Sequence, residues 1–393
     1  MERLVVRAFA ALSGAALLPA AWLVAMAGPA AAAPGVLRVG CGERAYATIG
    51  SAVSAAAPGQ TVVVCPGTYH EEVVVPADKP LSIEGIGHPV VDATGFDQGV
   101  LVLASHSEVE GLTVENAIGE GILVEGAPGE PITDVTVSRN TVTRNDQGNP
   151  TGASISTSGY AECNAAGLVP GDCGEGIHLM VADDSRVLGN VVRANSGGIL
   201  LTDEFGPTDG NLVAFNTVAD NTLDCGVTVV GHNASAFAQG VPQPGVAGVY
   251  DNTIWHNRVT DNGVAGQGGG VILATGPPGG AVYDNRVVGN YLSGNGLAGV
   301  TVHSHAPGQD LNGNTVTGNI IATNNLDGDF DFSPLVDPST TGVFVGSVGP
   351  LSITVTGNVF VKDVYGIWTT PTVTVLGGAA NVFAAVSTPL FVA

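Results

Sequence analysis

A pair of asparagines five residues apart recurs along the chain and constrains the fold more than any other feature of the sequence. Six copies are complete and a seventh ends in Asp: Asn140/Asn145, Asn190/Asn195, Asn216/Asn221, Asn257/Asn262, Asn290/Asn295, Asn319/Asn324 and Asn358/Asp363. An apolar residue stands three positions before and two positions after the first Asn of every copy. Self-similarity of this kind is typical of solenoids, in which each repeat buries its apolar face against the next.

A second repeated segment, Gly followed by Ile or Val, any residue and another apolar residue, comes after each of several Asn pairs. It occurs at Gly176–Leu179, Gly198–Leu201, Gly226–Val229, Gly270–Leu273, Gly299–Val302 and Gly342–Val345. The alternation predicts a short β-strand with one face turned inward. Asn tolerates the left-handed backbone of a sharp corner, and stacked amides can donate and accept along the axis. We therefore expect the repeated Asn residues to form an internal ladder in an all-β parallel solenoid.

The first coil of such a solenoid needs a cover, because its core and strand edges would otherwise be exposed. The segment 48–59 predicts a capping α-helix: Thr48 can cap it, Ile49, Val53 and Ala56 share one face, and Pro58-Gly59 ends it. We therefore expect one domain over 33–393, with an N-terminal cap at 41–75 and repeat coils at 76–393.

The first 32 residues have the order of a signal peptide. Arg3 and Arg7 precede an uncharged, Ala- and Leu-rich stretch over 8–28, and a small-residue site precedes Pro34. Cleavage is expected near Ala32, with an uncleaved membrane anchor as the alternative. No later segment resembles a spanning helix, so the mature chain is expected to be secreted or held at the cell surface.

Export would make disulfides possible for the five cysteines. Cys41 and Cys65 bracket one N-terminal unit and Cys163 and Cys173 bracket one loop, so these are the two predicted pairs. Cys225 is left over and is predicted to be a buried structural thiol.

The formal net charge is -23, which repels phosphate backbones and anionic headgroups. Nucleic acid and acidic membrane surfaces are therefore not expected as partners. A polysaccharide or another glycan of the cell envelope is the expected partner, and the chain is expected to act as a monomer.

The run Tyr46-Ala-Thr-Ile49, Ala52-Val53, Ala57-Pro-Gly59, Val62–Val64 and Pro66–Glu71, followed by the Asn and Gly-Ile repeats, resembles the secreted bacterial proteins of the pectin-lyase-like superfamily. The resemblance covers nearly all of the mature chain and implies a single-stranded right-handed parallel β-helix. It does not imply one function, because lyases, hydrolases, esterases, epimerases and non-catalytic surface proteins share this scaffold.

Loop lengths indicate which face of the solenoid is used. The insertions at 146–173 and 325–341 precede the Gly-Ile strand, and those at 231–246, 275–280 and 304–310 follow it. We therefore expect a groove for an elongated ligand on the outward face of this strand row. The outward positions hold His178, Met180, Thr202, Thr228, Thr301 and His303, with Trp368 near the end; Asp183, Asp184, Asp203, Glu204, His232 and His305 lie just beyond.

Carboxylates and imidazoles on neighbouring coils could act as acid and base on a glycosidic or ester centre, as in a polysaccharide lyase or glycoside hydrolase. The candidates are His178, Asp183, Asp184, Glu204, His232 and His303. The alternative is ordinary polar decoration of a non-catalytic surface or envelope module. No known enzyme motif is complete: the polygalacturonase-like pattern is reduced to Asp183-Asp184 and Gly231-His232, so no catalytic assignment carries over.

Two groups of residues could bind metal ions. Asp327, Asp329 and Asp331 alternate as oxygen donors to calcium would, although the later Gly and Glu of an EF-hand loop are absent, and a solvated acidic turn is the alternative. His178, His232, His303 and His305 could bind a transition metal, as in copper-accessory β-helix proteins. Only His303 and His305 have close ligand spacing, and no Met or Cys cluster accompanies them.

Overall fold

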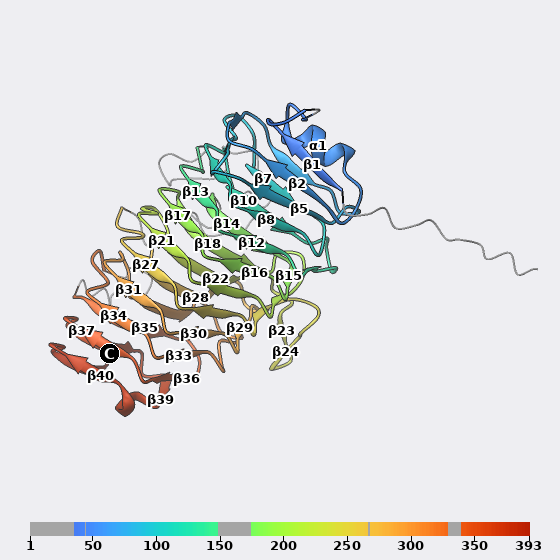
Figure 1. The fold of residues 1–393 in the computed structure, drawn as a ribbon. Helices are drawn as coiled ribbons and strands as arrows, with labels where there is room; N and C mark the ends of the chain where they lie inside the picture. Colours follow the sequence, from blue (N-terminus) through green and yellow to red (C-terminus); the bar gives the residue numbers. More distant parts are fainter. Residues whose placement is uncertain (1–34, 44, 148–173, 266–267, 329–338) are drawn as a thin grey trace, which may run out of the picture. The chain divides into compact units, whose positions relative to one another are not determined.

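The computed structural model describes residues 35–43, 45–147, 174–265, 268–328 and 339–393. The chain winds through successive coils, and each strand pairs in parallel with the equivalent strand of the next coil (Figure 1). The fold is a right-handed parallel β-helix with an N-terminal capping helix, as predicted. Its strands form three long sheets, here called A, B and C in chain order, and one short sheet between C and the next strand of A.

Sheet A consists of β1 (Val36–Val39), β2 (Gln60–Val64), β5 (Leu81–Gly85), β8 (Glu108–Glu110), β12 (Thr136–Ser138), β16 (Arg186–Leu188), β20 (Leu212–Ala214), β26 (Thr253–Trp255), β30 (Arg286–Val288), β33 (Thr315–Thr317), β36 (Leu351–Thr356) and β39 (Val373–Leu376). Sheet B consists of β3 (Thr68–Tyr69), β6 (Val90–Asp92), β9 (Thr113–Glu115), β13 (Thr141–Thr143), β17 (Val191–Arg193), β21 (Thr217–Ala219), β27 (Arg258–Thr260), β31 (Tyr291–Ser293), β34 (Ile320–Ala322), β37 (Val359–Val361) and β40 (Val382–Ala384).

Sheet C contains the Gly-Ile strands and consists of β4 (Val73–Val75), β7 (Val100–Val102), β10 (Ile122–Glu125), β14 (Glu175–Met180), β18 (Gly197–Thr202), β22 (Val227–Gly231), β28 (Val271–Thr275), β32 (Val300–Ser304), β35 (Thr341–Gly346), β38 (Tyr365–Thr369) and β41 (Thr388–Val392). The short sheet consists of β11 (Ile132–Thr133), β15 (Ala182–Asp183), β19 (Thr208–Asp209), β25 (Val249–Tyr250) and β29 (Val282–Tyr283). An antiparallel hairpin, β23 (Phe237–Ala238) and β24 (Val241–Pro242), projects from one loop, and a 3-10 helix, η2, spans Gly378–Ala380.

The predicted asparagine ladders are present at the corners between the sheets. In one rung, the backbone N–H and the side-chain Nδ2 of Asn216 both donate to Oδ1 of Asn257, at 2.9 and 3.0 Å. The same Nδ2 also donates to the carbonyl of Val187 at 2.8 Å. A third ladder, which was not predicted, runs through Asn211, Asn252, Asn285 and Asn314 between the short sheet and sheet A.

The cap has the predicted form. Helix α1 (Ile49–Ala55) begins after Thr48, whose side chain accepts a hydrogen bond from Ser51 N. The Glu71 carboxylate accepts the backbone N–H groups of Ile49 and Gly50, each at 2.8 Å, so the first turn is satisfied from the next coil.

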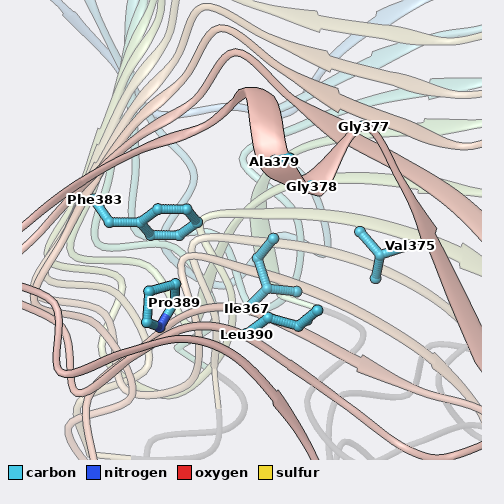
Figure 2. A pocket seen from close by; sticks show the side chains of 8 residues that line it. All are labelled: Ile367, Val375, Gly377, Gly378, Ala379, Phe383, Pro389 and Leu390. Atoms are coloured by element: carbon cyan, nitrogen blue, oxygen red, sulfur yellow. The ribbon is translucent and has the colours of Figure 1, made fainter.

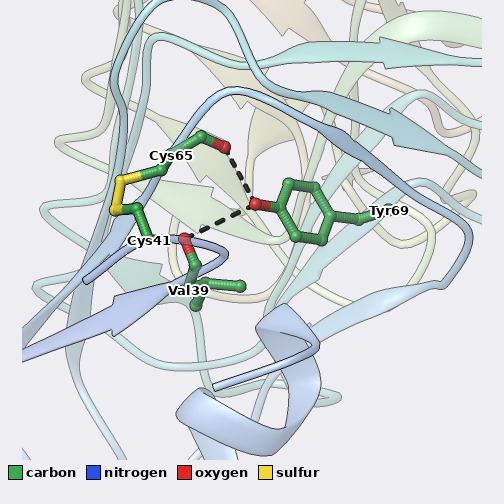
Figure 3. Close-up of a disulfide and its surroundings, with 4 residues drawn as sticks. All are labelled: Val39, Cys41, Cys65 and Tyr69. Carbon is green, nitrogen blue, oxygen red and sulfur yellow. Dashed lines mark hydrogen bonds between the residues drawn. A yellow bond between two sulfur atoms is a disulfide. The ribbon is translucent and has the colours of Figure 1, made fainter. Parts of the chain in front are cut away.

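A disulfide joins Cys41 to Cys65 beside the cap, as predicted. The hydroxyl of Tyr69 donates to the carbonyl of Cys65 at 2.9 Å and also faces the carbonyl of Val39 (Figure 3). Cys225 is buried, as expected, and its Sγ accepts a hydrogen bond from Gly269 N. The proposed signal peptide and the Cys163–Cys173 pair lie outside the described residues. Over the described ranges, the structure contains no helix with the length and apolar character needed to span a bilayer.

We expect Asn257→Ala to lower the free energy of unfolding by about 3 kcal/mol or more, because it leaves several buried backbone and amide groups without partners at about 1–3 kcal/mol each. Denaturant unfolding of the variant measures the loss. Thr217→Ala, at a half-buried position on the outward side of β21, is the matched control and should cost far less. Equal losses in the two variants would contradict the stabilising role of the ladder.

Candidate functional site

From β14 to β35 the outward face of sheet C is buried, which differs from the groove expected from the loop pattern. Leu200, Val230, Ile272 and Ala274 form a second apolar cluster on this side, apart from the central core. His178, Thr228, Thr301, His303 and Trp368 are each less than 5% exposed. These outward-facing polar side chains are therefore in contact with other protein groups rather than with solvent.

His178 is the centre of a chain of hydrogen bonds within this buried face. Its Nδ1 lies 3.3 Å from Oε1 of Glu120, and its Nε2 lies 2.8 Å from Oγ1 of Thr202. Thr202 donates its hydroxyl proton to Glu204, so it accepts the Nε2 proton of His178. Burial alone would lower the pKa of His178, but hydrogen bonding and the charges of Glu120 and Glu204 outweigh it and raise that pKa.

Glu204 extends this series of hydrogen bonds to His232, whose Nδ1 lies 2.7 Å from Glu204 Oε1. Burial disfavours the ionised carboxylate, but the hydrogen bond and charge of His232 dominate and lower the pKa of Glu204 to about 2. Both carboxylate oxygens of Glu204 are engaged, one by Thr202 and one by His232. These groups form a buried hydrogen-bond network running from Glu120 to His232.

Asp203, beside this network, fixes the long loop that follows β22. Its Oδ1 accepts the backbone N–H groups of His232 and Asn233 at the start of the loop, at 2.7 and 3.1 Å. Its Oδ2 accepts Gly248 N at the end of the loop, at 2.7 Å. The buried Asp203 carboxylate thus binds both ends of the loop that connects β22 to β25. Burial raises the pKa of Asp203 to about 7.

A second polar group lies on the outward side of the short sheet. Asp183, Asp209, Tyr250 and Tyr283 stand in one column, each on the next coil. Tyr250 is hydrogen bonded to Asp209, while burial and the neighbouring Asp183 raise the pKa of Asp209 to about 6. The two tyrosine rings stack at 4.9 Å and pack beneath Ala236 and Ala247 of the anchored loop.

The predicted catalytic residues do not converge in one place. His178, Glu204 and His232 are joined, whereas Asp183 lies on the short sheet and Asp184 is exposed at its corner. His303 lies three strands further along sheet C from Thr202, packed against His305 with ring centroids 4.4 Å apart. Glu120 and Asp209 were missed, because neither belongs to a recognised motif.

An apolar pocket of about 490 Å³ lies at the last coil, away from all these groups (Figure 2). Ile367, Val375, Phe383, Pro389 and Leu390 line it, together with Gly377, Gly378 and Ala379. Since none of these side chains ionises, the pocket has no acid, base or metal ligand.

The comparisons with known proteins agree with this architecture. Residues 105–327, more than half of the chain, match the family model described as periplasmic copper-binding protein (NosD), so the chain belongs to the NosD family. No curated protein matches the sequence.

Two solved structures share the fold. The A-module of the mannuronan C-5 epimerase AlgE4 from Azotobacter vinelandii is 14% identical, with a TM-score of 0.51; the match covers 87% of this chain and 91% of that one. The Dettilon tailspike protein is 15% identical, also with a TM-score of 0.51, and covers 88% of this chain and 64% of that one. At these identities the likeness is one of fold alone.

The described residues do not fit a copper ion. Among them, no three His, Cys, Asp or Glu side chains gather in an arrangement that could hold a metal. Both ring nitrogens of His178 face protein oxygens, and Nδ1 of His305 lies 3.0 Å from the carbonyl of Thr275. Met180, a soft potential ligand, packs instead with Leu123 and Val181.

The calcium prediction gains no support. Asp327 is half-buried, and among the described residues it belongs to no group of three or more His, Cys, Asp or Glu side chains that could hold a metal ion. Asp329 and Asp331 lie outside the described residues.

The buried Asp146 carboxyl group predicts that stability falls as the pH rises from about 4 to about 8. Burial raises the pKa of Asp146, which accepts a hydrogen bond from Ser196, from 3.8 to about 8. Between these two values the folded state holds a proton that the unfolded state releases, so stability decreases with pH across that window. We expect Asp146→Asn to make the loss between pH 5 and pH 8 smaller by roughly 1–3 kcal/mol.

Denaturant unfolding of both proteins at the two pH values measures this difference. Asp220→Asn, at an exposed corner, should leave the pH dependence of the wild type unchanged. An Asp146→Asn variant whose stability falls with pH as steeply as that of the wild type would refute the assignment.

Proposed function

We propose that this protein is a periplasmic or cell-surface module that binds a neutral polysaccharide without cleaving it. The observation that supports this proposal most strongly is the column of Asp183, Asp209 and Tyr250 on successive coils. This column lies beside the loop after β22, which Asp203 binds at both ends. The periplasmic description of the family and the Cys41–Cys65 disulfide support an envelope location.

The buried network supports binding rather than turnover. A general acid or base must reach the proton that it transfers, within about 2.6–3.2 Å or through one water. His178 has both ring nitrogens against Glu120 and Thr202, and Glu204 has both oxygens against Thr202 and His232. These contacts hold the loop and strand in place, and the remaining candidates are scattered over other coils.

The column on the short sheet has the chemistry of a sugar-binding surface. Asp183 and Asp209 are half-buried acceptors on adjacent coils, about 4.8 Å apart along the axis, so they can accept hydrogen bonds from neighbouring hydroxyls. A net charge of -23 disfavours a polyanionic ligand, which leaves neutral glycans as the better partners. Copper has no part in the proposal, because the described residues do not fit it.

Asp183→Asn and Asp209→Asn should each weaken binding of a neutral oligosaccharide by roughly tenfold, because a charged hydrogen-bond acceptor is lost. A panel of neutral and uronate hexasaccharides, measured by calorimetry with the intact protein, identifies the ligand first. Reducing-end and unsaturated-product assays on the same samples should show no turnover.

Asp220→Asn and Asp261→Asn, at exposed corners between sheets B and C, are the matched controls and should bind as the wild type does. Release of reducing ends that Glu204→Gln abolishes would overturn the non-catalytic assignment. Failure of the wild type to bind any glycan of the panel would overturn the proposed function itself.

A further inference from the structure

Three aromatic side chains form an exposed ridge at the corner between sheets A and B. Phe215 follows β20, and His256 stands at the equivalent position one coil further along, directly after Trp255, which pairs with Ala214. The Phe215 ring lies 4.9 Å from the Trp255 ring and 6.0 Å from the His256 ring, almost parallel to the latter. Phe215 is 56% exposed and Trp255 36%, so these rings contribute little to the core.

The backbone at this corner makes the ridge costly for folding. Phe215 and His256 have positive φ angles of 59° and 52°, in the left-handed region that disfavours bulky residues. At the equivalent corner of the flanking coils the chain has Gly189 and Gly289, at φ 63° and 65°. Bulky rings kept in strained backbone and left in solvent point to a role outside stability.

The surroundings of the ridge indicate its ligand. The six strands of sheets A and B in these coils, β20, β21, β26, β27, β30 and β31, contain no Asp or Glu, although the chain as a whole is strongly acidic. Exposed Arg258, two residues after His256, lies over the Tyr291 ring at 4.8 Å. The surface thus combines ring faces with hydrogen-bond donors from Trp255, His256 and Arg258.

We propose that this ridge, formed by Phe215, Trp255 and His256, is a second binding site, which stacks a pyranose ring of a neutral polysaccharide. A pyranose has an apolar C–H face that covers an aromatic ring, and hydroxyl edges that accept from the neighbouring donors. Rings one coil apart, at about 4.8 Å, suit consecutive sugars of an extended chain. The inference rests on the proposed function but concerns a different face, since the Asp183–Asp209 column lies on the short sheet.

Tryptophan fluorescence tests the site directly, because Trp255 is exposed and Trp368 is buried. A neutral hexasaccharide should change the emission of the wild type and of Trp368→Phe. In Trp255→Phe the emission change should be absent, and in Trp255→Ala calorimetry should show affinity reduced by roughly tenfold. Phe215→Gly should also weaken binding while raising the unfolding temperature, because it relieves the strained corner.

Ile320→Ala, at an exposed apolar position on the same side of sheet B, is the control for lost apolar surface and should bind normally. Normal affinity in Trp255→Ala and Phe215→Gly, with binding still weakened in Asp209→Asn, would overturn the ridge as a binding site and leave the proposed function standing. Absence of glycan binding in the wild type would overturn both. Binding of uronate oligosaccharides alone, or a dimer that Trp255→Ala dissociates, would overturn the assigned ligand.

Discussion

The stacked asparagine amides are the interaction on which the rest of the structure depends. Each corner turns the chain sharply and leaves backbone groups pointing inward, where water cannot satisfy them. Asn257 donates its Nδ2 to the Val213 carbonyl of the preceding coil, and it donates both this Nδ2 and its backbone N–H to Oδ1 of Asn290 on the next coil. Corner after corner therefore keeps one register. Because the register is fixed, residues at equivalent positions form columns, as Asp183, Asp209, Tyr250 and Tyr283 do on the short sheet.

This constraint also explains where chemistry can and cannot occur. From β14 to β35 sheet C is buried on both sides, so an ionisable group on its outward face needs hydrogen-bond partners, as His178 has in Glu120 and Thr202. Solvent reaches the short sheet and the corner between sheets A and B, where Asp183 is half-buried and Phe215 exposed. The proposed binding function therefore belongs to these solvent-exposed surfaces, while the buried hydrogen-bonded groups hold the loop after β22.

The sequence predicted the fold closely, because the features that define it are local and repeated. The Asn pairs, the Gly-Ile strands and the Thr48 cap each have a physical reason that holds without knowledge of distant contacts. The third ladder was missed, although Asn211, Asn252, Asn285 and Asn314 each stand five residues before a predicted Asn. Recognising it would have identified Asp209 and Tyr250 as a surface column, since each stands two residues before a ladder Asn.

The site was less predictable, because burial and pairing depend on which loops lie over which strands. Alternation indicated correctly that His178 points away from the core, but not that the outward face is itself covered. The partner of His178 is Glu120, 58 residues away, and no local pattern connects them. The aromatic ridge was missed for another reason: Phe215 and His256 stand where most other repeats have Gly, so they depart from the repeat pattern that predicted the fold.

The most direct test of this account is a crystal structure of the protein with a bound neutral hexasaccharide. The account predicts sugar density on the outside of the coil, beside Asp183 and Asp209 or over Trp255, with the contacts of His178 to Glu120 and Thr202 unchanged. Sugar bound on the sheet C side, with the Glu204–His232 pair opened and its side chains against a glycosidic oxygen, would contradict it.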